Sequence, residues 1–131
     1  MPNILSTLFA LIVQGRMGFL YSLVRLLKMS CVLRISVPNV EAALQSLSIS
    51  PYRVENGTAH FDVSDASFDN FNGQIEDAIT FLSANGTDVK RLMSKSNASG
   101  GLDFGIDWRN VVAQFDTLPA ALVRLAGEVS N

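Results

Sequence analysis

The sequence has few of the residues that most often carry metal and redox chemistry. Its 131 residues include one cysteine, Cys31, and one histidine, His60. A lone cysteine excludes an intramolecular disulfide and any multi-cysteine zinc or iron–sulfur site, and it fits a reducing compartment. No spacing of His, Cys, Asp or Glu matches a zinc site or a calcium loop. We therefore expect no metal, no cofactor and a cytoplasmic protein.

Basic residues are scarce after the first forty positions. Residues 1–40 carry four basic side chains and no acidic one, whereas residues 41–131 carry six basic side chains against all twelve acids. An acidic body repels a phosphate backbone, and no basic stripe with interleaved aromatics is present, so nucleic acid is excluded as a partner. A hydrophobic content of 48% with 17% charged residues predicts one folded domain.

The apolar N-terminal stretch lacks the uninterrupted run that a membrane-spanning helix requires. Arg16 lies in the middle of residues 4–27, and the segment before Arg16 is too short to span a bilayer. At helical spacing the stretch is amphipathic with a basic polar face. We expect residues 1–28 to be an amphipathic helix or an extension outside the domain, and Met29 stands where an initiator methionine of that domain would. If the segment is retained, residues 4–27 could instead anchor the protein peripherally on a membrane surface.

Residues 29–131 have the pattern of a single α+β domain. "CVLRISV" alternates as a strand, and "NVEAALQSL" has helical spacing with Asn39 as its N-cap. In "YRVENGTAHFDV", Asn56-Gly57 suits a type I′ turn, which predicts a hairpin pairing Arg53 with His60 and Glu55 with Thr58. The hairpin register places His60 on the outward face.

The second half of the domain alternates helix and strand. The spacing predicts a helix from Ser67 to Leu82, an end at Asn85-Gly86 and a further short helix in "TDVKRLMSK". "SNASGG" reads as a loop, "LDFGIDW" as a strand and "TLPAALVRLAG" as a last helix ending at Gly127. The expected fold is α+β, with a small mostly antiparallel sheet of three to four strands, helices on one face and an exposed sheet edge.

Three stretches resemble a known family. They are "LRISVPNVEAALQSLSISPYRV", "IEDAITFLSANGTDVKRLM" and "GGLDFGIDW" followed by "LPAALVRLAGE". On these stretches the chain resembles the bacterial domain-of-unknown-function 4279 family of small uncharacterised α+β domains. The resemblance implies a sheet with helices on one face, closed by one more strand than is expected here, and places residues 1–28 outside the domain. It implies no catalytic residues.

One polar sheet face is the candidate site. His60 is a candidate acid or base oriented by Asp62, the two being the candidate catalytic residues. A ligand could also bind to this face, for which the candidates are Arg34, Arg53, His60, Asp62, Asp103 and Asp107. The simpler interpretation is a solvated face with cross-strand charge pairs. Cys31 should point to the opposite, buried face and is not expected to act as a nucleophile.

Three functions fit these patterns. The first is a non-enzymatic protein-interaction module, for example an antitoxin or immunity-like protein, that binds another protein or itself through an exposed sheet edge. The second is a small-ligand-binding protein or enzyme that uses the face around His60. The third is a peripheral membrane protein anchored by residues 4–27. Because no catalytic motif is present, the sequence favours a function other than catalysis.

Overall fold

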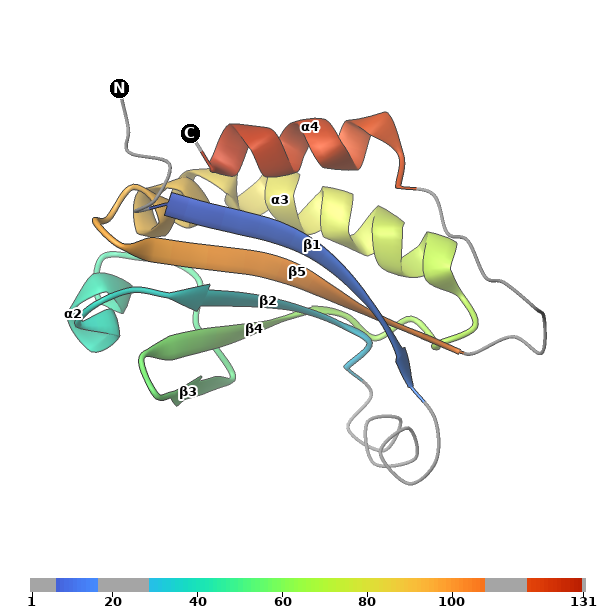
Figure 1. The fold of residues 1–131 in the computed structure, drawn as a ribbon, viewed down its shortest axis with the longest axis horizontal. Coiled ribbons are helices and arrows are strands. Elements are labelled where there is room, and N and C mark those ends of the chain that lie inside the picture. The colour runs from blue at the N-terminus through green and yellow to red at the C-terminus, as the bar shows by residue number, and fades with distance from the viewer. Residues whose placement is uncertain (1–6, 17–28, 108–117, 131) are drawn as a thin grey trace.

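The protein is an α+β sheet layered against two helices. A computed structural model describes residues 7–16, 29–107 and 118–130 (Figure 1). The elements in chain order are β1 (Thr7–Arg16), β2 (Cys31–Ser36), α2 (Val40–Leu44), β3 (Arg53–Glu55), β4 (Thr58–Ser64), α3 (Phe71–Met93), β5 (Ala98–Asp107) and α4 (Ala120–Val129). The five strands form one sheet in the order β1-β5-β2-β4-β3, so the predicted fold class is confirmed and the sheet is larger than predicted.

The centre of the sheet is antiparallel, as the sequence predicted. Strand β2 pairs with β4 on one side and with β5 on the other. The β3–β4 hairpin has the expected register, with Arg53 opposite His60 and Glu55 opposite Thr58. Asn56 and Gly57 have φ angles of 53° and 79°, which a type I′ turn requires. The turn chemistry alone therefore set the register of this hairpin.

The expected N-terminal helix is wrong over residues 7–16, which form strand β1. This strand pairs in parallel with β5 from Thr7 opposite Ala98 to Arg16 opposite Asp107, in the same sheet as the rest of the chain. Periodicity alone cannot separate a strand from a helix in a short apolar run. The backbone of β5 favours the strand, because β1 satisfies an edge that would otherwise be bare. The rest of the expected anchor, residues 4–6 and 17–27, lies outside the described residues.

Helix α3 is one continuous helix, so the predicted end at Asn85-Gly86 is wrong. It begins at Asn70, whose side chain accepts a hydrogen bond from the Gly73 amide at 3.0 Å, instead of at Ser67. A glycine inside a helix costs about 1 kcal/mol. Burial of each large apolar side chain later in the helix, such as Leu92, stabilises the fold by about 1.5–3 kcal/mol, so packing outweighs the local stop signal.

The core lies between the sheet and the helices α3 and α4, which cover one face (Figure 1). Alternate residues of β2, β4 and β5 enter it, as the period of two predicted. The buried core residues include Cys31, Leu33, Ile35, Ala59, Phe61, Ile75, Ala78, Leu82, Val89, Leu92, Met93, Leu102, Phe104 and Leu122. Helix α4 passes through Gly127 and ends at Val129, two residues beyond the predicted stop.

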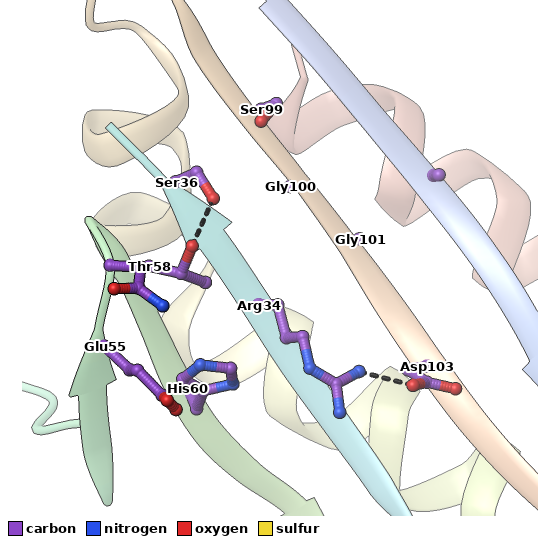
Figure 2. Close-up of a pocket in the computed structure, with 11 residues that line it drawn as sticks. Arg34, Ser36, Glu55, Thr58, His60, Ser99, Gly100, Gly101 and Asp103 are labelled. Atoms are coloured by element: carbon purple, nitrogen blue, oxygen red, sulfur yellow. Dashed lines mark hydrogen bonds and ion pairs between the residues drawn. The ribbon is translucent and has the colours of Figure 1, made fainter. Parts of the chain in front are cut away.

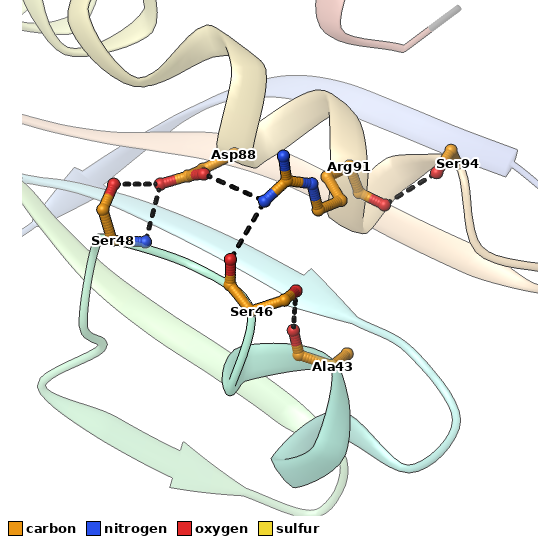
Figure 3. A network of polar contacts seen from close by, with 6 residues as sticks. All are labelled: Ala43, Ser46, Ser48, Asp88, Arg91 and Ser94. Carbon is orange, nitrogen blue, oxygen red and sulfur yellow. Dashed lines mark hydrogen bonds and ion pairs between the residues drawn. The ribbon is translucent and has the colours of Figure 1, made fainter.

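A polar network fastens the loop after α2 to helix α3 (Figure 3). One carboxylate oxygen of Asp88 accepts hydrogen bonds from the Ser48 amide at 3.1 Å and from the Ser48 hydroxyl at 2.7 Å. Arg91 donates to the Ser46 carbonyl at 2.9 Å. The Ser48 hydrogen bonds lower the pKa of the Asp88 carboxyl, since they favour its ionised form. The network therefore has a structural role.

Candidate functional site

The polar side chains gather on the sheet face opposite α3 and α4. Residues on this face alternate with core residues, so Arg34 on β2, His60 on β4 and Asp103 on β5 share it. They line an open hollow of about 570 Å³ (Figure 2). Its lining comprises Ala10, Arg34, Ser36, Glu55, Asn56, Thr58, His60, Ser99, Gly100, Gly101 and Asp103, and we call it the open-face hollow.

The hollow exists because its floor carries almost no side chains. Gly101 on β5 lies beside Ala10 on β1 and Arg34 on β2. A Cβ atom built on Gly101 would lie 2.7 Å from the Ala10 carbonyl oxygen, closer than such atoms approach, so glycine permits the close pairing of β1 with β5. This floor departs from the sequence prediction, which treated residues 96–101 as a loop; residues 98–101 belong to β5.

An ion pair forms one wall of the hollow. Nη1 of Arg34 donates to Oδ2 of Asp103, and the pair is drawn in Figure 2. The side chain of Asp103 is 3% exposed and that of Arg34 is 38% exposed. A guanidinium carries five N–H donors in a rigid fork, and the bond to Asp103 fixes the orientation of that fork. Arg34 is therefore held in place, with donors left for water or a ligand.

His60 contributes a buried nitrogen to the same face. The residue is 7% exposed, and its Nδ1 atom has no hydrogen-bond partner among the described residues. Burial lowers the pKa of His60 below its ordinary 6.5, and the nearby Arg53 and Arg34 lower it further. The imidazole is thus neutral at pH 7, with one nitrogen that accepts a hydrogen bond and one that donates. The Tyr52 ring packs beside it, with centroids 6.0 Å apart.

The remaining polar groups of the wall are paired with one another. The hydroxyls of Ser36 and Thr58 lie 2.6 Å apart, and either can be the donor. The Glu55 carboxylate forms an ion pair with Nε of Arg53 at 3.3 Å, at the rim of the hollow. Both carboxylates in the lining, Glu55 and Asp103, therefore already face an arginine.

The structure brings together half of the predicted site. Arg34, His60 and Asp103 line the hollow, whereas Arg53 contributes only through its ion pair with Glu55. Asp62 shares their sheet face but is absent from the lining, and among the described residues no hydrogen bond joins its carboxylate to the His60 ring. Asp107 ends β5 opposite Arg16, and its side chain lies outside the described set.

Sequence reasoning missed the small residues that shape the site. The alternation of strands 31–37 and 58–64 already placed Ser36 and Thr58 on the outward face, so a search for hydroxyls there would have found them. Ser99 and Gly101 were hidden because a run of Ser, Asn and Gly is typical of a loop. They form a strand because β1 pairs with this segment on one side and β2 on the other.

Other chemistry-bearing groups lie apart from the hollow. Asp62 lies with Asp65 and Asp77 around Ser64, and partial burial together with Asp65 raises the pKa of Asp62 to about 6. Within the described ranges, no group of three His, Cys, Asp or Glu side chains could hold a metal ion. Cys31 is fully buried on the core face, and burial raises the pKa of its thiol. No helix in the described part of the chain is long and apolar enough to cross a membrane.

Comparison with known proteins adds no relative. No protein-family model, no curated protein and no solved structure matches the chain significantly. The resemblance drawn from the three sequence stretches therefore stays a prediction. Any functional conclusion must come from the geometry of the sheet face.

Proposed function

We propose that the protein binds a small molecule in the open-face hollow. The observation that carries this proposal is His60, whose Nδ1 atom is buried without a partner among the described residues. Buried polar atoms are normally hydrogen-bonded to protein or to water, so this nitrogen has capacity for a water molecule or a ligand group. The hollow around it measures about 570 Å³, within the range of small-molecule sites, and Arg34 lies on the same face.

The geometry supports binding better than catalysis. A general base needs a group that orients it and a nucleophile or substrate proton within reach. Among the described residues His60 has no carboxylate hydrogen-bonded to its ring, and the Ser36 and Thr58 hydroxyls bond to each other. Cys31 points to the opposite face. The polar groups of the hollow can therefore position a ligand, while an acid–base relay is not assembled.

A fragment screen by protein-observed NMR tests this proposal. We expect compounds at millimolar concentration to shift the amide signals of β2, β4 and β5 residues that line the hollow. Ser99→Leu places an apolar side chain in the hollow and should abolish these shifts. Thr80→Leu, on the exposed surface of α3, is the matched control and should retain them. Shifts that map elsewhere, or that persist in Ser99→Leu, would refute the proposed site.

A second candidate is protein interaction through the β3 edge. Strand β3 ends the sheet and all three of its residues are exposed, including Val54 at 38%, and the preceding Tyr52 is 42% exposed. Exposed strand edges pair readily with another chain. Replacing Val54 by Lys should then abolish any concentration-dependent dimer in light scattering. An unchanged dimer in the variant, or a monomer at all concentrations with no partner captured, would remove this candidate.

A further inference from the structure

The ligand class follows from an imbalance between donors and acceptors in the hollow. Building on the binding function proposed above, we propose that the ligand is a small carboxylic acid: its ionised carboxylate accepts hydrogen bonds from Arg34, and its flat apolar body lies over Gly101 and Ala10. Three observations lead to this inference. They are the free donors of the wall, the bare floor and the surroundings of His60.

The free hydrogen-bonding capacity of the wall is mostly that of donors. Arg34 uses one of its N–H groups on Asp103, and the rest of its fork remains. In the Ser36–Thr58 pair only one hydroxyl proton lies between the two oxygens, so the other can be donated to a ligand. The acceptors of greatest strength, Asp103 and Glu55, each face an arginine. A ligand must therefore supply acceptors, and a planar carboxylate matches the planar fork of Arg34.

The charges around the hollow permit an anion. Arg34 offsets Asp103, and Arg53 offsets Glu55, so the described charged side chains of the wall and rim balance. An incoming carboxylate meets no net negative field from them. Because Arg34 is held by a nearly buried partner, little side-chain entropy is lost when it binds. This pre-organisation favours a bidentate contact over a loose surface ion pair.

The floor selects the shape of the rest of the ligand. Gly101 has no side chain and Ala10 has one methyl group, so few side-chain atoms project from the surface between β2 and β1, and its backbone groups are used in the sheet. A flat apolar ring covers such a surface without leaving polar groups unpaired. A ligand with bulky substituents on both faces would not lie against it. The floor thus favours an aromatic or other planar acid.

His60 makes the binding of an anion depend on pH. The charged groups that face it are Arg34 from β2 and Arg53 and Glu55 from β3, with Tyr52 as an uncharged neighbour. The imidazole is neutral at pH 7, and a bound carboxylate would stabilise its protonated form. Binding should then take up a proton from solvent and tighten as the pH falls through the range in which His60 titrates. A neutral ligand would show no such tightening.

Benzoate and benzamide are the matched probes for this inference. They share one shape, and only benzoate carries a charge at pH 5.5–7.5. We expect NMR titration to show benzoate binding the hollow about tenfold more tightly than benzamide. Arg34→Lys keeps the cation beside Asp103 but loses the planar fork, and it should reduce the preference for benzoate. From pH 7.5 to 5.5 benzoate affinity should rise about threefold or more, and His60→Gln should abolish this rise.

The outcomes separate this inference from the function on which it rests. If fragments bind in the hollow but benzamide equals or exceeds benzoate, the carboxylate inference is wrong and the proposed function stands. If benzoate binds equally well to Arg34→Lys and to the wild type, Arg34 does not receive the carboxylate. If no compound of any charge shifts the lining residues, both proposals fail. A spectrum of each variant with dispersed signals first establishes that the variant folds.

Discussion

The Arg34–Asp103 ion pair allows a sharp test of the energetics of the open face. Exposed ion pairs contribute about 0–1 kcal/mol, whereas breaking a buried one costs about 3–5 kcal/mol. Here the carboxylate is 3% exposed and the guanidinium is 38% exposed, so the pair lies between these limits. We expect Arg34→Ala to lower the free energy of unfolding by about 2–3 kcal/mol, after the discount for solvent screening at Arg34.

Removing Arg34 and removing Asp103 should lower the free energy of unfolding by different amounts. Arg34→Ala leaves a charge at the buried position, whereas Asp103→Asn leaves one on the more exposed side chain, which water can solvate. Asp103→Asn should therefore cost less than Arg34→Ala. The double variant Arg34→Ala/Asp103→Asn should be more stable than Arg34→Ala alone, because it removes the buried charge as well.

Urea unfolding followed by circular dichroism measures these differences, and the thermal midpoint gives a second reading. For a chain of 131 residues about 1 kcal/mol corresponds to roughly 4 °C, so Arg34→Ala should melt about 8–12 °C lower. Arg124→Ala is the matched control, since its pair with Glu128 is 71% and 62% exposed and should contribute less than about 0.5 kcal/mol. Equal losses in Arg34→Ala and Arg124→Ala would refute the buried-pair reasoning.

Four further predictions follow from groups described above. Because the folded state lowers the pKa of His60 below 6.5, its stabilising contribution is complete at higher pH and is lost on acidification; His60→Gln should show a shallower fall in stability between pH 7 and 5. Ionisation of Asp62 destabilises the folded state at high pH, because its pKa of about 6 lies above the ordinary 3.8. Asp62→Asn should therefore raise the melting temperature at pH 7 by a small amount and have no effect near pH 3.5. Asp88→Ala should expose the amide of Ser48 to fast hydrogen exchange. In the wild-type protein this amide should lose its protection only when the pH falls below the ordinary pKa range of an aspartate. Protection that survives the substitution would contradict the network. Gly101→Ala forces a Cβ against the Ala10 carbonyl, so hydrogen exchange should quicken in β1 while α3 stays protected, at a cost of about 1–3 kcal/mol.

The sequence predicted the parts of the fold whose signals are local. Asn56-Gly57 fixed the hairpin register, and the alternation of "CVLRISV" placed Leu33 and Ile35 in the core, because turn geometry and a period of two act over a few residues. The predicted end of helix α3 was wrong because burial of residues on either side of Gly86 outweighs this local stop signal. Strand β1 was missed because its partner β5 is distant in the sequence, and no local pattern links the two segments.

The site was predictable to the same extent. Arg34 and His60 were placed on one face by alternation, and Asp103 by the strand that contains it. Their distances to one another could not be predicted, because they depend on β2 lying between β4 and β5, which no local pattern specifies. Asp62 was assigned to His60 from sequence proximity, whereas in the sheet it lies with Asp65 instead.

The pairing of β1 with β5 determines when β1 can fold during synthesis on the ribosome. Thr7 is synthesised about 90 residues before its partner Ala98. At about 5–20 residues per second, β1 has no strand to join for roughly 5–18 s. During that interval the apolar segment "TLFALIV" is uncovered, and unpaired apolar segments of this kind are prone to aggregate. Nascent chains should therefore depend on a chaperone more than the completed protein does.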